Sequence, residues 1–127
     1  MFEVNKGAPP HQIKFCVWDT SNGIVGCLTG GESPHVGGVV LAVPRASLTG
    51  TGNSCDCWII PISGHKDAEV VAPIAEEFCK TLNVPVSLTA GVHMDSATSR
   101  DIKVFSENCA DAGKEMLELL KQQEKER

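Results

Sequence analysis

Three of the four histidines in this sequence stand in similar local settings, and they are the residues best suited to chemistry. They are His35 in SPHVGG, His65 in SGHKD and His93 in AGVHMD. Each follows a run typical of a β-strand and a turn marked by glycine or proline. Imidazole is the commonest metal ligand among side chains and titrates near neutral pH, so three of them in one place would favour metal or proton chemistry.

A divalent metal is the first hypothesis for these side chains. Three histidines and a carboxylate suit Zn²⁺, Mn²⁺ or Fe²⁺. The carboxylates nearest to the histidines are Asp67 and Asp95. The candidate ligands are His35, His65, His93 and Asp95. A single loop histidine is more often simply solvated, so the prediction depends on a fold that joins distant segments. His11, near the N-terminus, is expected to take no part.

Glycine-rich segments beside the histidines offer a second kind of site. In TGG (29–31) and VGG (36–38), backbone N–H groups are free to approach a ligand closely. GHK (64–66) precedes an expected helix N-terminus, which favours anions, and Lys66 would add a positive charge. The alternative is that these glycines only make tight turns. The segments match neither a P-loop nor a dinucleotide-binding fingerprint.

Composition restricts the partners. The chain has 127 residues, enough for one domain, and a net charge of −5. A negative chain has no general attraction for nucleic acids or anionic membranes. With 5% aromatic residues and no tyrosine, base-stacking surfaces are not expected. No apolar stretch approaches the ~18 residues of a membrane span. We therefore expect neither nucleic-acid nor membrane partners.

Six cysteines raise the question of disulfides or metal binding. The sequence does not begin with a basic segment followed by an apolar run, so we expect a cytoplasmic protein whose thiols stay reduced. Most of the cysteines occupy apolar positions of predicted strands or helices, where cysteine acts as a small hydrophobic residue. Cys55 and Cys57 would share one face of a strand, and without a CxxC pair a chelating role is the less favoured alternative.

Hydrophobic periodicity predicts the elements that must position these residues. Apolar runs, alternating or continuous, predict strands at 12–20, 24–30, 39–44, 55–63 and 84–91. An apolar stripe predicts a helix over 67–82, which either kinks at Pro73 or begins its regular part late. A second helix begins at SATSRDI, where Thr98 and Asp101 form a capping-box pattern, and continues through 108–125.

These elements favour a single α+β domain over 1–127, with an irregular N-terminus at 1–11 and a solvated, charged tail at 121–127. Consecutive strands joined by short turns predict a mostly antiparallel sheet of five to six strands, flanked by two to three helices. His65 and His93 would share one edge of this sheet if the strands that precede them lie parallel or close together.

Three segments match the motifs of a known family. TGGESPHVGGVVLA, SGHKDAEVVAPIAEEFCKTL and VPVSLTAGVHMDSATSRDI occur in the family's order, over roughly residues 24–120. The sequence resembles the prenylated-flavin chaperones, the small D subunits of UbiD-type hydroxyarylic acid decarboxylases such as gallate decarboxylase. That family is related in fold to the proteasome assembly chaperones. Gly38 departs from the pattern, where Asp or Ala is usual.

The resemblance implies a non-catalytic protein that binds reduced prenylated FMN, or FMN, and stabilises it or delivers it to a UbiD-type catalytic subunit. A divalent metal would sit at the histidines or bridge the flavin phosphate. The implied fold is an antiparallel sheet flanked by helices, assembled as a homodimer. The cofactor-binding residues would be Gly30, Gly31, Pro34, His35, Gly37, Gly38, Gly64, Lys66 and Gly91.

Two other functions stay open. An interaction protein like the proteasome assembly chaperones would act through an exposed apolar surface and need no small ligand. A small metal-dependent hydrolase would need an open metal position and a carboxylate base, for which Asp95 is the candidate. The sequence has no GxSxG elbow and no acid pair placed for general acid–base catalysis, so the hydrolase is the least favoured of the three.

Overall fold

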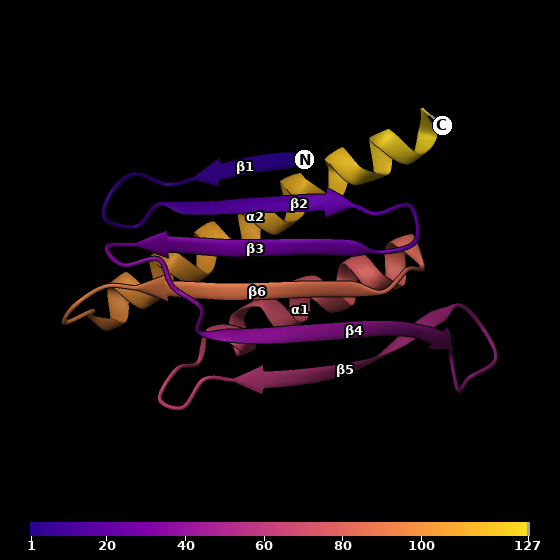
Figure 1. Ribbon diagram of the computed structural model, residues 1–127, viewed down its shortest axis with the longest axis horizontal. Coiled ribbons are helices and arrows are strands. Elements are labelled where there is room, and N and C mark those ends of the chain that lie inside the picture. Colours follow the sequence, from indigo (N-terminus) through magenta and orange to yellow (C-terminus); the bar gives the residue numbers. More distant parts are fainter. Residues whose placement is uncertain (127) are drawn as a thin grey trace.

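Six strands and two helices make up residues 1–126, the part of the chain that the computed structural model describes (Figure 1). The elements are β1 (Phe2–Lys6), β2 (Ile13–Asp19), β3 (Ile24–Gly31), β4 (Gly38–Ala46), β5 (Asn53–Pro61), α1 (Asp67–Leu82), β6 (Val86–His93) and α2 (Ser99–Lys125). The strands form one open sheet in the order β1-β2-β3-β6-β4-β5. The predicted α+β class, with a mostly antiparallel sheet, is confirmed.

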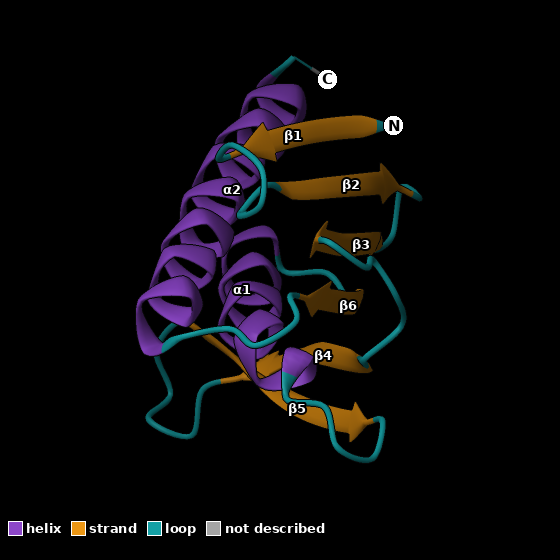
Figure 2. Ribbon diagram, turned by 90° about the vertical axis from the view of Figure 1, so that its left-hand side faces the viewer, coloured by secondary structure: helices purple, strands orange, loops and turns teal. Residues whose placement is uncertain are grey.

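Period-two patterns decide which side of each strand is buried. In β2, Phe15 and Val17 are buried, whereas Lys14 and Trp18 are exposed. The same alternation continues in β3 and β6, and the register between strands places the buried residues on one face. Both helices lie on that face (Figure 2). No helix within residues 1–126 covers the opposite face, which we call the open face.

One parallel pair brings distant segments together. β3 pairs parallel with β6, while the other neighbouring strands are antiparallel. β5 runs antiparallel to β4, which runs antiparallel to β6, so β3, β5 and β6 all end on the same side of the sheet (Figure 1). Both helices begin on this side as well. The three histidine-bearing segments follow or end these strands, so the topology gathers them at one edge, as the sequence predicted.

The helices bury apolar stripes against the sheet. Phe78 of α1 stacks on Phe15 of β2, with ring centroids 6.0 Å apart. α1 is helical throughout Asp67–Leu82 with Pro73 inside it, so the alternative of a late start is wrong. α2 begins at the predicted capping box: the Thr98 hydroxyl accepts from the Asp101 N–H, and the Asp101 carboxylate accepts from the Thr98 N–H.

Two local predictions need correction. The irregular N-terminus is wrong for Phe2–Lys6, which form β1; its five residues are too short for an alternating pattern to stand out beside GAPP. The apolar spacing within 67–82 also predicts that Val70 belongs to the buried stripe of the helix, but Val70 is 40% exposed. The second helix ends at Lys125, as predicted, and its charged end is mostly exposed up to Glu126; Arg127 lies outside the described residues.

Candidate functional site

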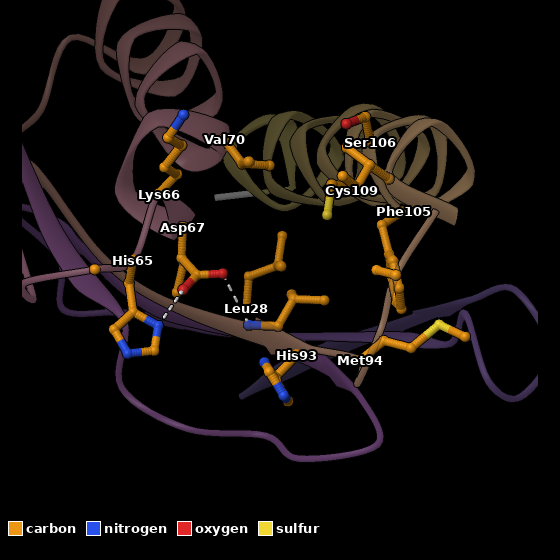
Figure 3. Close-up of a pocket in the computed structure, with 15 residues that line it drawn as sticks. Leu28, His65, Lys66, Asp67, Val70, His93, Met94, Phe105, Ser106 and Cys109 are labelled. Carbon is orange, nitrogen blue, oxygen red and sulfur yellow. Dashed lines mark hydrogen bonds and ion pairs between the residues drawn. The ribbon is translucent and has the colours of Figure 1, made fainter. Parts of the chain in front are cut away.

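Asp67, the first residue of α1, lies between two of the histidines. Its Oδ2 atom is 3.3 Å from Nε2 of His35 and 3.7 Å from Nδ1 of His65. Its Oδ1 atom accepts a hydrogen bond of 3.1 Å from the backbone N–H of Val92 in β6. One carboxylate therefore joins the loop after β3, the start of α1 and the end of β6. Figure 3 shows its contacts with His65 and with the backbone of β6.

The tautomer of His35 follows from its other contact. Nδ1 of His35 lies 2.9 Å from the backbone carbonyl of Ser33. A carbonyl oxygen only accepts hydrogen bonds, so Nδ1 carries the hydrogen, and the neutral ring presents a lone pair at Nε2. That Nε2 atom is buried and makes no hydrogen bond. A lone pair facing a carboxylate oxygen is repulsive, so a cation or a proton between the two atoms would stabilise the arrangement.

These three side chains have the spacing of a metal site. The ligand atoms of His35, His65 and Asp67 all lie within 4.8 Å of one another. Two ligands held at tetrahedral angles with Zn–N or Zn–O bonds of ~2.0–2.1 Å lie about 3.3 Å apart, close to the separations from Asp67. Imidazole nitrogen and carboxylate oxygen are ligands that Zn²⁺ accepts, and three of them leave a fourth position for another ligand. The residues therefore fit a divalent metal.

His93 and Asp95 form a separate pair beside this cluster. Nε2 of His93 lies 2.9 Å from Oδ1 of Asp95, and both side chains are largely exposed. The His93 ring centroid is 6.2 Å from that of His35, compared with 4.8 Å between His35 and His65. The structure thus brings all three predicted histidines to one edge, but it groups two of them with Asp67. The sequence feature that could have identified Asp67 as a ligand is its position two residues after His65, at the start of a helix on the same edge.

Several of the predicted glycines have their space filled by the protein itself. A Cβ atom at Gly91 would overlap the backbone carbonyl of His35, and one at Gly37 would overlap the Asp67 carboxylate. A Cβ atom at Gly31, where φ is +76°, would overlap the carbonyl of His93. Because glycine has no side chain, the histidine loops can pack against the strand ends and against Asp67 at these positions. By contrast, the position of a Cβ at Gly64 is open.

A cleft of about 330 Å³ opens next to the cluster, between α1, α2 and the end of β6 (Figure 3). His65 and Asp67 border it on one side, and Lys66 extends away from His65 along the start of α1. The interior is mainly apolar. Its larger apolar side chains are Leu28, Val70, Val92, Met94, Ile102 and Phe105. The periodicity of α2 did not mark this cleft, because it forms only when α1 and α2 are placed side by side.

The Cys109 thiol points into the cleft from α2 (Figure 3). Burial, with a smaller contribution from the negative charge of Asp67, raises the pKa of this thiol to about 12. Burial also raises the pKa of Cys79 to about 11. Both cysteines are buried in the apolar core as free thiols, which supports the interpretation of cysteine as a small hydrophobic residue.

His11 lies outside the cluster and has a structural role. Its Nε2 atom is 2.7 Å from Oδ1 of Asp101, and its ring packs edge-on against Phe105 with centroids 5.2 Å apart. The Asn108 side chain donates a hydrogen bond of 2.9 Å to the His11 carbonyl. These contacts hold the segment before β2 against the first turns of α2, next to the cleft wall at Phe105.

The comparisons with known proteins agree with this architecture. Residues 7–121 match the family model of the prenylated flavin chaperone LpdD-like domain. A chain in the crystal structure of a chaperone complex for yeast 20S proteasome assembly is similar in fold, with a TM-score of 0.53 and 15% identity over 95% of this chain and 94% of that one. No curated protein matches the sequence. At 15% identity, the structural likeness concerns the fold alone.

The family match confirms the resemblance seen in the three sequence segments and extends it to the N-terminal side. A chaperone family is a family of accessory proteins, so the family match makes the chain an accessory protein rather than an enzyme. No helix within residues 1–126 is both long enough and apolar enough to cross a membrane. Because the matched region includes nearly the whole chain, this protein belongs to the prenylated flavin chaperone LpdD-like family.

Proposed function

We propose that this protein binds reduced prenylated FMN at the edge formed by the ends of β3, β5 and β6, and delivers it to a UbiD-type decarboxylase. The observation that carries the proposal is the placement of an apolar cleft directly beside the cluster of His35, His65 and Asp67. A chaperone for a flavin needs an apolar surface for the ring system and a means to hold an anionic group. Membership of the prenylated flavin chaperone family supports the choice of ligand.

A divalent metal is part of the proposal. His35, His65 and Asp67 would hold it, and it would supply a positive charge for an anionic or carbonyl oxygen of the flavin. His93 and Asp95, also chosen from the sequence as ligands, lie next to this position and would complete the metal's surroundings or contact the flavin. Two histidines and one carboxylate are donors that Zn²⁺, Mn²⁺ and Fe²⁺ all accept, so the proposal concerns a divalent metal of this group.

Backbone and lysine donors would complete the binding site. Gly64 and Lys66 border the cleft, where nothing fills the space beside the Gly64 Cα atom. The other glycines of the predicted set, together with Pro34, would act by shaping the loop that carries His35. The free thiols of Cys79 and Cys109 are in keeping with the cytoplasm, where thiols stay reduced.

The first test is a native mass spectrum of the protein, co-expressed with a prenylated-flavin synthase and purified without oxygen. We expect a bound mass equal to that of prenylated FMN, with or without one metal ion. Protein made without the synthase is the control and should lack this mass. A ligand-free spectrum, obtained while the synthase is shown to be active, would contradict flavin binding.

A second proposal concerns the association of two copies of this chain. Trp18, Val25, Leu41 and Trp58 form an exposed apolar row across the open face, and large exposed apolar surfaces commonly mark interfaces. We infer that two copies associate through this face as a homodimer. If the mass spectrum shows a dimer without flavin, an assembly chaperone that needs no small ligand becomes the better interpretation.

A further inference from the structure

Two exposed hydrophobic residues on the helices need an explanation. Most large hydrophobic residues exposed within residues 1–126 belong to strands or loops; only Val70 and Ile102 belong to helices. Val70 is 40% exposed and Ile102 is 59% exposed, and both line the cleft beside the cluster of His35, His65 and Asp67. Val70 has the spacing of a core residue, yet it faces the cleft. Two helices that otherwise expose polar side chains thus present hydrocarbon to the same hollow, which favours an apolar occupant.

Most polar groups of the cleft lie at its border. His65, Lys66, Asp67 and His93 line the side nearest the cluster of His35, His65 and Asp67. On the side of α2, Ser106 and Cys109 also line the cleft, and the Ser106 hydroxyl points away from Leu28 (Figure 3). A neutral thiol is a weak hydrogen-bond donor, so the cleft offers few partners for polar atoms beside Cys109.

A flavin has two chemically different ends. The pyrimidine ring carries carbonyl and N–H groups, whereas the benzenoid ring and the adjacent prenyl-derived ring are hydrocarbon. Burying an unpaired carbonyl or N–H group is unfavourable, whereas burying hydrocarbon is favourable. A volume of about 330 Å³ is near the lower end of ligand pockets, ~300–1,000 Å³, so the cleft suits part of a flavin rather than the whole cofactor.

We propose that this cleft is the subsite for the hydrocarbon end of the cofactor. The prenyl-derived and benzenoid rings lie against Val70, Ile102 and Phe105. The pyrimidine ring lies toward His65 and Asp67, and the phosphate chain lies outside the cleft. This inference rests on the proposed function, since it assigns the parts of the same ligand.

The test compares Val70→Ser and Ile102→Ser with Leu48→Ser. Leu48 is 92% exposed in the turn between β4 and β5, away from the cleft, and serves as the matched control. All three sites are exposed, so the fold should persist, which circular dichroism can verify. In anaerobic titrations, each cleft variant should bind reduced prenylated FMN about tenfold more weakly than the unmodified protein. Binding of reduced FMN should change much less, and Leu48→Ser should behave like the unmodified protein. Equal affinities of all variants for prenylated FMN would overturn the subsite.

A second measurement separates the subsite from the choice of cofactor. Methyl resonances of Val70, Ile102 and Met94 are followed by NMR while prenol, a prenyl alcohol without a flavin, is added. Shifts confined to these methyl groups support the hydrocarbon subsite even if prenylated FMN fails to bind, in which case only the proposed function falls. If prenylated FMN binds without moving these resonances, the subsite is wrong and the proposed function stands. If neither ligand moves them, the subsite is overturned.

Discussion

At the scale of single residues, the site depends on one carboxylate that the sequence only half identified. His35 and His65 were chosen from their turns, and the structure places them together. Asp67 and Asp95 are the two carboxylates nearest to the histidines in the sequence. The sequence favours Asp95 as the metal ligand, whereas the structure groups Asp67 with His35 and His65. Local sequence could not decide between them, because the choice depends on how the start of α1 meets the end of β6. The Val92 N–H fixes this meeting point by donating to Asp67.

Replacement of each carboxylate in turn by an amide gives a direct test of the metal ligands. Asp67→Asn keeps an oxygen that can accept from the Val92 N–H but removes the charged ligand atom between the histidines. We expect affinity for Zn²⁺ or Co²⁺ to fall about a hundredfold or more, measured by calorimetry and by the visible spectrum of Co²⁺. Asp95→Asn is the matched control and should bind the metal nearly as well as the unmodified protein. The opposite result would place the metal at His93 and Asp95 instead.

Gly91 makes a second prediction at this scale. A Cβ atom there would overlap the backbone carbonyl of His35, and backbone atoms cannot move aside as a flexible side chain can. Gly91→Ala should lower the free energy of unfolding by about 1–3 kcal/mol and displace the His35 loop. Urea denaturation measures the first effect. Gly50→Ala is the control: a Cβ there meets nothing within 4 Å, so it reports only the strain of a left-handed backbone, φ +82°. An equal loss in both variants would count against the overlap.

At the scale of elements, local patterns predicted most of the fold. Alternation located β2, the apolar stripes located both helices, and the Thr98–Asp101 pattern located the start of α2. The parallel pairing of β3 with β6 was not predictable in the same way, because it joins strands separated by a hairpin and a helix. β1 was missed because a short strand gains its stability from pairing along the edge of β2 rather than from its own pattern.

The contact between His11 and Asp101 of α2 leads to a prediction about how stability depends on pH. Hydrogen bonds from the Thr98 backbone, and then from His11, lower the pKa of Asp101 to about 2, from an ordinary value of 3.8. In the unfolded chain this carboxyl takes up a proton near pH 4, whereas in the folded protein it stays ionised until about pH 2. The unfolded state therefore binds more protons in this window, and stability falls as the pH drops through it.

Urea denaturation between pH 5 and pH 2 in about half-unit steps would measure this effect. Asp101→Asn removes the titrating group while an amide oxygen still accepts from Thr98. The variant should lose less stability than the unmodified protein as the pH falls from about 4 to 2. Parallel losses in the two proteins would show that Asp101 does not contribute to the acid sensitivity.

At the scale of the whole molecule, the sheet is covered on one face only. The register aligns Trp18, Val25, Leu41 and Trp58 across the open face, with Ser87 between the second and third. Six strands spaced ~4.8 Å apart, each about seven or eight residues long, give a face of roughly 700–800 Å². A standard protein–protein interface buries about 800 Å² on each partner, so this face is large enough for a stable dimer.

The charges at the two ends of the open face also permit self-association. Arg45 is paired with Asp56 at 2.9 Å near one edge of the sheet, and Lys14 is paired with Glu3 at 3.6 Å near the other. Because each charge already has a partner of opposite sign in its own chain, two copies can approach without repulsion between unpaired like charges. The apolar row between these pairs would then supply the interface core, with tryptophan side chains at its two ends.

Leu41 is the residue at which this association is best tested. It lies on β4 between Ser87 and Trp58, so a lysine there would place an unpaired charge near the centre of a dimer interface, while in a monomer it would remain in solvent. Leu41→Lys should leave the fold intact and weaken dimerisation about a hundredfold or more, measured by sedimentation equilibrium. Leu48→Lys adds the same charge at the exposed β4–β5 turn and should stay dimeric. A variant Leu41→Lys that dimerises like the unmodified protein would show that the open face is not the interface. A monomeric unmodified protein would leave this apolar row available to the decarboxylase, in which case Leu41→Lys should weaken cofactor delivery without changing cofactor affinity.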